Sequence, residues 1–514
     1  MKLFSKFVSL FNFFKQLYMK KFLLGSAIFL FSIFNAQKND INYYIKNAPF
    51  KFGEVVLPTI PEKAYSIKDF GGIGNGKFLN TKAFETAISA INQNGGGKLI
   101  IPAGIWLTGP IELKSNINFH VEEGAIVQFS DDINQFPLRE TSPGKIDVTP
   151  PIWGDNLHDV AFTGKGVFDG AGDAWRPVKK YKVDDFAWKN LLAKKGSVLS
   201  DDGKVWWPSF DAKEGERLSK SITKKKDATI EDYKKLHHFL RPMMFTLSKV
   251  KNLLIDGPTF RNSPKFILNP RQITNLVIKN TNVYNPSWAQ NGDGIDISAS
   301  KNVIIYNTYV NAGDDGICMK SSGESKDGEA KLQNVIIAEC TVNDAHGGFV
   351  IGSNTDGGMK NIYVTNCTFD GSDNGIRVKS NSGRGGEVSE IYIDNITLKN
   401  IKENAFIFDT SYADAPVGST KESEDAQKTG DKIPFFHHFY ISNINCSETE
   451  NAFMFLGLKE KPIQDLFFKN INIVKSNTDL KGDFFQNIVF ENVKVNGQKD
   501  IKIPGKLKTA IQIK

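Results

Sequence analysis

Aspartates set among glycines are the residues of this chain whose types and spacing could do chemistry. Asp293 lies between two glycines, and the adjacent pair Asp314 and Asp315 follows it. Hydrolysis of a glycosidic bond needs one carboxylic acid to protonate the leaving oxygen and one carboxylate to activate water or attack the sugar. Clustered like charges raise the pKa of at least one carboxyl group, which keeps an acid protonated near working pH. The three aspartates could fill both roles; the competing interpretations are an Asp/Gly turn and a calcium site.

Three further polar residues fall in phase with these aspartates. Asp314 and His346 belong to neighbouring copies of a repeat that is described in the next paragraph. Each lies at the same distance after the asparagine that begins its own copy. Arg377 and Lys379 alternate with Val378, so both side chains point to one face of a strand. Arginine can bind a carboxylate through two hydrogen bonds, so this pair is a candidate clamp for an anionic ligand. The competing interpretations are a turn histidine and a solvated basic face.

These residues are positioned by a short phrase that recurs from residue 250 onward, an asparagine followed by β-branched and other apolar residues. Its first five copies begin at Asn252, Asn275, Asn302, Asn334 and Asn361, at intervals of 23, 27, 32 and 27 residues. Irregular repeats of this length, each a short strand between turn residues, indicate a solenoid. The units lack a 3.6-residue apolar period, which argues against helical repeats. We therefore predict an all-β, right-handed parallel β-helix whose turn asparagines stack in amide ladders with left-handed backbone angles.

The first coil of such a solenoid needs a cover. The segment 80–92 places five apolar residues on one helical face: Ala83, Phe84, Ala87, Ile88 and Ile91. Asn80 or Thr81 could cap the start of this helix, and the glycines at 95–97 end it. We predict an N-terminal capping helix laid across the open end of the core.

Two segments interrupt the repeat, 176–240 and 411–436. The first is rich in lysine and contains Trp206 and Trp207, whereas the second is polar and loop-like. Long insertions in a solenoid emerge on one side, often the binding side. We expect the first insertion to close one end of a binding cleft, which would restrict attack to chain ends. The alternative is an unrelated surface lobe.

The N-terminus resembles an export signal. Lys20 and Lys21 precede an apolar run that ends near Ala36, and this run is too short to span a bilayer comfortably. We predict a signal peptide cleaved near Ala36, preceded by an upstream extension, with translation starting at Met1 or Met19. The mature protein would then be secreted or periplasmic, with an N-terminal extension over 37–63 and the β-helix over 64–514. An N-terminal membrane anchor is the alternative.

The charge and cysteine content of the chain limit the classes of partner that we expect it to bind. The formal net charge is +7, but the lysines are scattered apart from the run 224–226, so no nucleic-acid-binding arm is predicted. The four cysteines have no zinc-type spacing and are expected to be buried apolar residues: Cys318, Cys340, Cys367 and Cys446. We predict no metal, no cofactor, no membrane association after signal cleavage, and a monomer.

Four motifs in a fixed order resemble those of glycoside hydrolase family 28, the polygalacturonase family. They are Asn291-Gly292-Asp293, Gly313-Asp314-Asp315, Ala345-His346-Gly347 and Arg377-Val378-Lys379. The resemblance extends over about residues 64–510. Gly292, Ala345 and Val378 depart from the family's Thr, Gly and Ile, and none of these departures removes a titrating group.

The resemblance implies hydrolysis of α-1,4-galacturonosyl linkages in polygalacturonate or pectin with inversion at the sugar. Asp314 would be the general acid, while Asp293 and Asp315 would hold and activate water. His346 would orient and tune the acid. The substrate, an acidic polysaccharide, would be bound by Asn291, Arg377, Lys379 and, on position alone, Tyr412. Inverting enzymes have carboxyl separations of roughly 6.5–9.5 Å.

Three alternatives stay open from the sequence. The first is hydrolysis of rhamnogalacturonan or xylogalacturonan instead of polygalacturonate. The second is a calcium-dependent pectate lyase, which shares the fold but eliminates instead of hydrolysing. The third is a β-helix that binds glycans without catalysis. Dependence on calcium would distinguish the lyase, and the activity of an Asp314→Asn variant would distinguish a binding protein from an enzyme.

Overall fold

The computed structural model describes residues 40–142, 144–196, 198–324, 328–412, 432–499, 501–504 and 509–514. The predicted signal peptide and most of the second insertion lie outside these residues. The chain divides after Asn47 into two compact units. In the first, α2 (Ile41–Lys46) begins after Asp40, whose carboxylate accepts a hydrogen bond from Tyr43 N at 2.9 Å. Among the residues described, no helix combines the length and apolarity that a membrane span requires.

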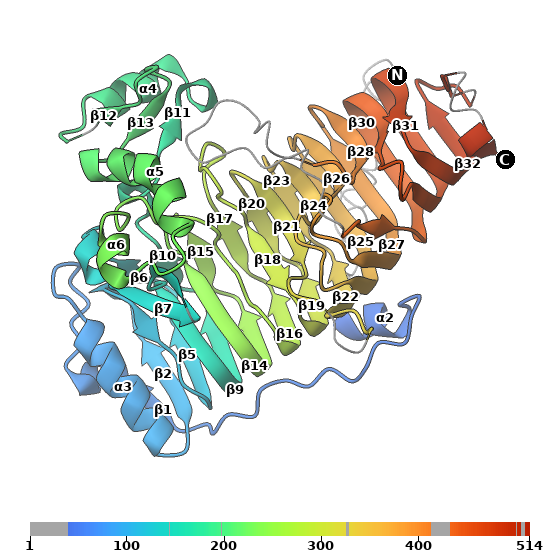
Figure 1. The fold of residues 1–514 in the computed structure, drawn as a ribbon. Coiled ribbons are helices and arrows are strands. Elements are labelled where there is room, and N and C mark those ends of the chain that lie inside the picture. Colours follow the sequence, from blue (N-terminus) through green and yellow to red (C-terminus); the bar gives the residue numbers. More distant parts are fainter. Residues whose placement is uncertain are drawn as a thin grey trace, which may run out of the picture. The chain divides into compact units, whose positions relative to one another are not determined.

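The second unit is a parallel β-helix, as predicted (Figure 1). Each strand pairs in parallel with its copy one coil further along, and the same hydrogen-bonded network joins 28 strands into a single solenoid. The coils before the first insertion contain β1 (Ala64–Ser66), β2 (Gly97–Ile101), β3 (Gly104–Thr108), β4 (Ile111–Glu112), β5 (Ile117–Val121), β6 (Ala125–Phe129), β9 (Ile152–Gly164) and β10 (Val167–Asp169). The short 3-10 turns η1 (Ile67–Phe70), η2 (Ile133–Gln135) and η3 (Gly172–Ala174) accompany them.

The later coils carry the repeat. Those in the middle of the chain contain β14 (Phe245–Asp256), β15 (Thr259–Arg261), β16 (Thr274–Lys279), β17 (Asn282–Tyr284), β18 (Ile295–Ser298), β19 (Lys301–Tyr306), β20 (Tyr309–Asn311), β21 (Asp315–Lys320), β22 (Leu332–Ala338), β23 (Thr341–Asn343) and β24 (Gly347–Ile351). The last coils contain β25 (Met359–Asp370), β26 (Asn374–Lys379), β27 (Glu387–Lys399), β28 (Asn404–Asp409), β29 (Phe435–Phe436), β30 (Phe439–Leu456), β31 (Ile463–Asp483), β32 (Phe485–Val495) and β33 (Ile511–Ile513).

Register between coils places like residues on top of one another. Val303 in β19 pairs with Leu276 in one neighbouring coil and with Val335 in the other, and all three side chains are fully buried. Such columns form one apolar core that is continuous from Ile67 to Ile511. The four cysteines are unpaired and buried, as predicted.

The predicted amide ladder is present, and its asparagines lie within the strands β14, β16, β19, β22 and β25. The Nδ2 atom of Asn275 donates to Asn252 Oδ1 at 2.8 Å, and the same contact recurs at 3.1, 3.2 and 3.1 Å through the next coils up to Asn361. All five backbones lie in the left-handed region, with φ between 57° and 65°. Asparagine tolerates this conformation, and its amide both donates and accepts, so one residue type satisfies both needs.

The capping helix is α3 (Thr81–Gln93), and its buried residues are the five that were predicted. Phe84 stacks on Phe119 of the first coils with ring centroids 5.6 Å apart. The predicted side-chain cap is wrong. Asn80 occupies the N-cap position, but its Oδ1 accepts from Ile73 N at 2.7 Å instead of from the helix, and its amide nitrogen donates to backbone carbonyls. Asn80 is fully buried, so its amide serves the adjoining loop instead of the helix.

The first insertion forms its own small subdomain, with the antiparallel sheet β11 (Val178–Lys179), β13 (Val205–Trp207) and β12 (Val198–Leu199). It also contains η4 (Lys180–Lys182), α4 (Asp185–Leu192), α5 (Phe210–Thr223) and α6 (Ile230–Lys234). A hairpin of β7 (Leu138–Ser142) and β8 (Lys145–Val148) contacts α6. Trp206 and Trp207 are buried, so these tryptophans contribute to the subdomain's core and expose little surface to a ligand.

Candidate active site

The predicted site residues meet at one edge of the sheet formed by β18, β21, β24 and β26. Asp315 begins β21 and pairs with Gly347, which pairs in turn with Asn374. Asp314 and His346 each precede their strand, and His346 N donates to Asp314 O at 2.7 Å. The parallel register therefore turns equal positions in successive coils into spatial neighbours.

These residues line a cleft of about 390 Å³. All eight predicted site residues are among its lining: Asn291, Asp293, Asp314, Asp315, His346, Arg377, Lys379 and Tyr412. The structure thus brings together residues that are up to four coils apart in the sequence.

The three aspartates form a tight cluster. One carboxylate oxygen from each of Asp293, Asp314 and Asp315 lies within 4.8 Å of the other two. This spacing between nearest oxygens is shorter than the roughly 6.5–9.5 Å separation of carboxyl groups expected for inverting glycosidases. Asp293 and Asp315 are only 3% and 2% exposed, so the cluster is held in a largely desolvated position.

Asp315 is held by two cations from β26. Lys379 Nζ lies 2.8 Å from Asp315 Oδ2, and Arg377 Nη1 lies 3.3 Å from Asp315 Oδ1. The ring of Tyr412 lies against the same two cations, 4.8 Å from Lys379 Nζ and 5.4 Å from Arg377 Cζ. The expected clamp for a substrate carboxylate is therefore already bound to a carboxylate of the protein, with Tyr412 fixing its position.

His346 bridges the aspartate cluster and the first insertion. Its Nδ1 lies 3.3 Å from Asp314 Oδ1, and its Nε2 lies 3.2 Å from Lys182 Nζ of η4. An ammonium group can only donate, so Nε2 must accept and Nδ1 carries the hydrogen that is donated to Asp314. Asn374 Nδ2 donates to the backbone carbonyl of His346 at 2.9 Å. The imidazole is thus held in one tautomer against Asp314.

Asn291 is positioned from behind by a buried arginine. Its backbone φ is 50°, in the left-handed region. Arg241 Nη2 donates to Asn291 Oδ1 at 2.8 Å, and Arg241 Nη1 donates to the carbonyl of Gln290 at 2.5 Å. Burial lowers the pKa of Arg241 to about 10. Because Asn291 Oδ1 already accepts from the protein, its amide nitrogen is the group suited to a ligand.

Sequence reasoning missed several residues that line the cleft. Lys320 Nζ lies 3.3 Å from Asp293 Oδ2 and also pairs with Asp296, which is fully buried beneath the site. The position of Lys320 in the cleft could have been predicted from the spacing of the repeat. Met319 pairs with Ile351 and Ile351 with Val378, so Lys320 and Lys379 each follow a residue of one column. The insertion residues Lys179, Tyr181 and Lys182 had no such signal, because they lie outside the repeat.

Burial and nearby charges shift the pKa values of Asp293 and Asp314 in opposite directions. Desolvation, reinforced by the nearby carboxylates of Asp296 and Asp314, raises the pKa of Asp293 well above its usual range. Desolvation also raises the pKa of Asp314, but the electrostatic interaction and hydrogen bond with the His346 ring, together with the charges of Lys379 and Lys182, outweigh it. The net result is a pKa of Asp314 below its usual range. In the substrate-free site Asp293 therefore holds a proton more readily than Asp314, the residue expected to be the acid.

The charges around the cluster disfavour a divalent cation. Six cationic side chains line the cleft beside the three aspartates: Lys179, Lys182, Lys320, Arg377, Lys379 and Arg384. Calcium sites are built from oxygen ligands with an excess of negative charge. Here two of the three carboxylates are paired with lysine or arginine, so the cleft suits an anion better than a metal ion.

Comparisons with known proteins agree with this arrangement. The family model described as glycosyl hydrolases family 28 matches residues 189–489. A Vitis vinifera protein described as a probable polygalacturonase is 28% identical over 354 residues, which cover 66% of this chain and 61% of the relative. A Dickeya chrysanthemi exo-poly-alpha-D-galacturonosidase is 27% identical over 481 residues, covering 88% of this chain and 76% of the relative. The chain therefore spans less than two thirds of the grapevine protein's length.

A solved structure of a hyperthermoactive exopolygalacturonase from Thermotoga maritima superimposes with a TM-score of 0.71. It is 25% identical and the match covers 89% of this chain and 96% of that one. This likeness confirms the right-handed parallel β-helix predicted from the repeat. Since the family model covers more than half of the residues, including all four motifs, the chain belongs to family 28 of the glycosyl hydrolases.

Proposed function

We propose that this protein hydrolyses α-1,4-galacturonosyl linkages of polygalacturonate, from chain ends and with inversion. The observation that carries the proposal is a cleft in which three clustered aspartates are surrounded by six cationic side chains. The aspartates supply groups for proton transfer and water activation. The surplus of cations supplies recognition of a substrate that bears a carboxylate on each sugar.

In the proposed mechanism Asp314 protonates the glycosidic oxygen, while Asp293 and Asp315 hold the attacking water. Asp293 Oδ1 is buried and has no hydrogen-bond partner among the described residues, so it can accept one from water. Asp315 is kept ionised by Lys379 and Arg377, as a base must be. Inversion rests on the family resemblance, since the nearest oxygens are closer together than the separations typical of that stereochemistry.

The general acid must acquire a proton before it can act. Burial, followed by the charge of Lys182, lowers the pKa of Lys179, so a negative charge brought close to it would stabilise its ammonium form. A galacturonate carboxylate docked against these lysines would supply that charge. It would also place a negative charge near Asp314 and so raise its pKa. Substrate binding then favours the protonated form of Asp314 where it is needed.

Attack at chain ends is supported by the first insertion. Lys179, Tyr181 and Lys182 extend from it into the cleft, and Lys182 reaches His346. A segment that contacts the catalytic histidine from outside the solenoid leaves less room for a chain to continue past the site. The residue Tyr181 is 69% exposed, which suits contact with a terminal sugar.

Product analysis on polygalacturonic acid, with a chelator present, tests the proposal. We expect saturated monogalacturonic acid from the first time point and no loss of activity in chelator. A ladder of saturated oligomers would retain hydrolysis but refute attack from chain ends. Unsaturated products that absorb ultraviolet light, or loss of activity in chelator, would favour the lyase. The absence of product would direct the test to rhamnogalacturonan and xylogalacturonan, and binding without turnover there would indicate a glycan-binding protein.

We also propose that residues 19–36 direct export, so that the mature chain acts outside the cytoplasm as a monomer with the β-helix over 64–514. The apolar run after Lys20 and Lys21 supports this. N-terminal sequencing of the exported protein should begin near Gln37, and light scattering should give the mass of one chain. Retention in the membrane fraction would favour the anchor.

A further inference from the structure

In the last coils, ionisable residues replace the asparagines of the amide ladder. The register that aligns Asn361 with earlier asparagines continues through Glu390, His438 and Asp465 before it returns to Asn487. All five residues have φ between 52° and 58°, so they occupy the same left-handed position. Three consecutive ladder positions have therefore exchanged an amide for an ionisable group.

This exchange interrupts the ladder's own hydrogen bonding. An amide donates to one neighbour and accepts from the other, whereas a carboxylate only accepts and a neutral imidazole has one ring nitrogen of each kind. Asp465 still accepts from Asn487 Nδ2, so the later part of the ladder is kept. At His438 the chain of amide hydrogen bonds is therefore broken.

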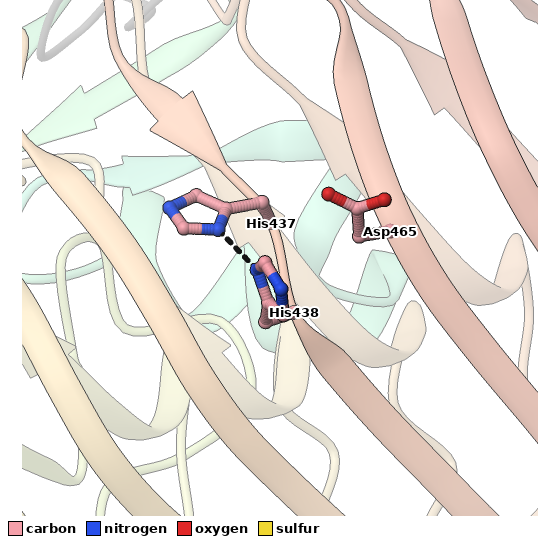
Figure 2. A group of neighbouring side chains, drawn as sticks. All are labelled: His437, His438 and Asp465. Atoms are coloured by element: carbon pink, nitrogen blue, oxygen red, sulfur yellow. Dashed lines mark hydrogen bonds between the residues drawn. The ribbon is translucent and has the colours of Figure 1, made fainter.

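His438, Asp465 and the adjacent His437 converge on one point. One nitrogen of each histidine and one carboxylate oxygen of Asp465 all lie within 4.8 Å of one another. Figure 2 shows the two rings meeting through their Nδ1 atoms, with the carboxylate of Asp465 alongside. Donor atoms bound to one zinc ion at about 2.0–2.2 Å in tetrahedral geometry are about 3.3 Å apart, so small side-chain rotations would bring these atoms to bonding positions.

The surroundings match those of a metal site. His437 Nε2 lies 3.0 Å from Glu387 Oε1, and a metal-binding histidine almost always donates its other ring hydrogen to such an acceptor. Asp465 Oδ2 accepts from Gln464 Nε2 at 3.1 Å, which fixes the carboxylate. The histidines and the aspartate are half-buried, so the position is accessible from solvent. None of the three lines the catalytic cleft.

We propose that His437, His438 and Asp465 bind a divalent transition metal ion of the zinc class. Two imidazoles and one carboxylate suit zinc, and water would complete four-coordination. Because β30 follows the two histidines and Asp465 lies in the next coil, in β31, the ion would link neighbouring coils near the C-terminal end of the solenoid. The alternative is a hydrogen bond in which the two Nδ1 atoms share one proton, with no role for a metal.

The ladder itself supplies substitutions that preserve the fold. His438→Asn and Asp465→Asn each restore the amide found at the equivalent position of earlier coils, so the backbone conformation and the contact with Asn487 are retained. His158→Asn is the matched control, because His158 also lies 3.0 Å from an aspartate, Asp159, but without a second histidine. Glu387→Gln tests the outer hydrogen bond.

The experiment titrates Zn²⁺ into the purified chain, prepared without a polyhistidine tag, in competition with a chromophoric chelator. We expect one ion per chain in the wild type and His158→Asn, loss of this binding in His438→Asn and Asp465→Asn, and about 10–100-fold weaker binding in Glu387→Gln. Co²⁺ should give the intense visible absorption of a four-coordinate site in the wild type only. Zn²⁺ should raise the unfolding temperature of the wild type but not of His438→Asn.

Two results would overturn the proposal. One is that the wild type binds no Zn²⁺, which would leave the proton-sharing hydrogen bond as the explanation. The other is that His438→Asn and Asp465→Asn bind Zn²⁺ as tightly as the wild type, which would place the ion elsewhere. Hydrolysis of polygalacturonate by these two variants should match that of the wild type, so the outcome is independent of the proposed catalytic function.

Discussion

Replacing Asp314 by asparagine separates the role of the acid from that of the base. Asp314 Oδ1 accepts from His346 Nδ1 at 3.3 Å and from the backbone nitrogen of Asp315 at 3.0 Å. An asparagine oxygen in the same place would keep both hydrogen bonds, so the variant should fold and bind substrate as the wild type does. It lacks only the ability to donate a proton to the glycosidic oxygen.

The size of the loss depends on the leaving group. For polygalacturonate, whose leaving oxygen must be protonated, we expect kcat to fall by about 10²–10⁴-fold, which corresponds to about 3–5 kcal/mol of transition-state stabilisation. For an α-galacturonide of an acidic nitrophenol, which leaves without protonation, the loss should be below about tenfold. Asp293→Asn should instead impair both substrates, because water activation does not depend on the leaving group.

The assay compares initial rates on the two substrates at several pH values, with KM as the measure of binding. An equal loss on both substrates in Asp314→Asn would refute the assignment of Asp314 as the acid. If Asp293→Asn showed the dependence on leaving group instead, the roles would be exchanged. That outcome would accord with the raised pKa of Asp293 in the substrate-free site.

Three further predictions concern stability, measured as the free energy of unfolding in urea. Lys379→Met leaves the buried Asp315 with only Arg377 as its cationic partner on β26 and should cost about 3–5 kcal/mol. Asp293→Asn should stabilise the protein at neutral pH. A raised folded-state pKa means that wild-type stability falls as pH rises above the unfolded value of about 3.9, so the gain should vanish below that pH. Phe84→Ala should cost about 3–5 kcal/mol, because Phe84 is fully buried against Phe119 at the capped end; losses under 1 kcal/mol would contradict the first and third.

Much of the site could be predicted from the sequence because the solenoid converts spacing into position. His346 was assigned to the cleft by its distance along the chain from the start of its coil, and the structure places it beside Asp314. The same arithmetic applied to Met319 and Val378 would have found Lys320. It could not find Lys182, because the insertion folds on its own sheet and its register bears no relation to the coils.

Side-chain pairing was less predictable than position. Arg377 and Lys379 were expected to bind a substrate carboxylate, and the structure gives them Asp315 as a partner. The sequence shows which residues share a face, but the choice among partners depends on distances of a few ångströms and on burial. The capping of α3 failed for the same reason, since the Asn80 oxygen that would cap the helix accepts instead from Ile73 N in the adjoining loop.

The ladder also indicates when an unusual residue implies a new site. Asp159 has a left-handed backbone, with φ of 51°, and a carboxylate at the start of the ladder, yet its role is structural. Its Oδ1 accepts from Asn252 Nδ2 and from Thr59 N, both at 3.0 Å, so the ladder ends on an acceptor as its hydrogen bonding requires. His438 lies between two carboxylate positions and receives no amide from either. The hydrogen bonding of the ladder thus explains an acidic residue at its end. It does not explain an imidazole within the ladder that faces a second imidazole and a carboxylate. A bound metal ion would explain that arrangement.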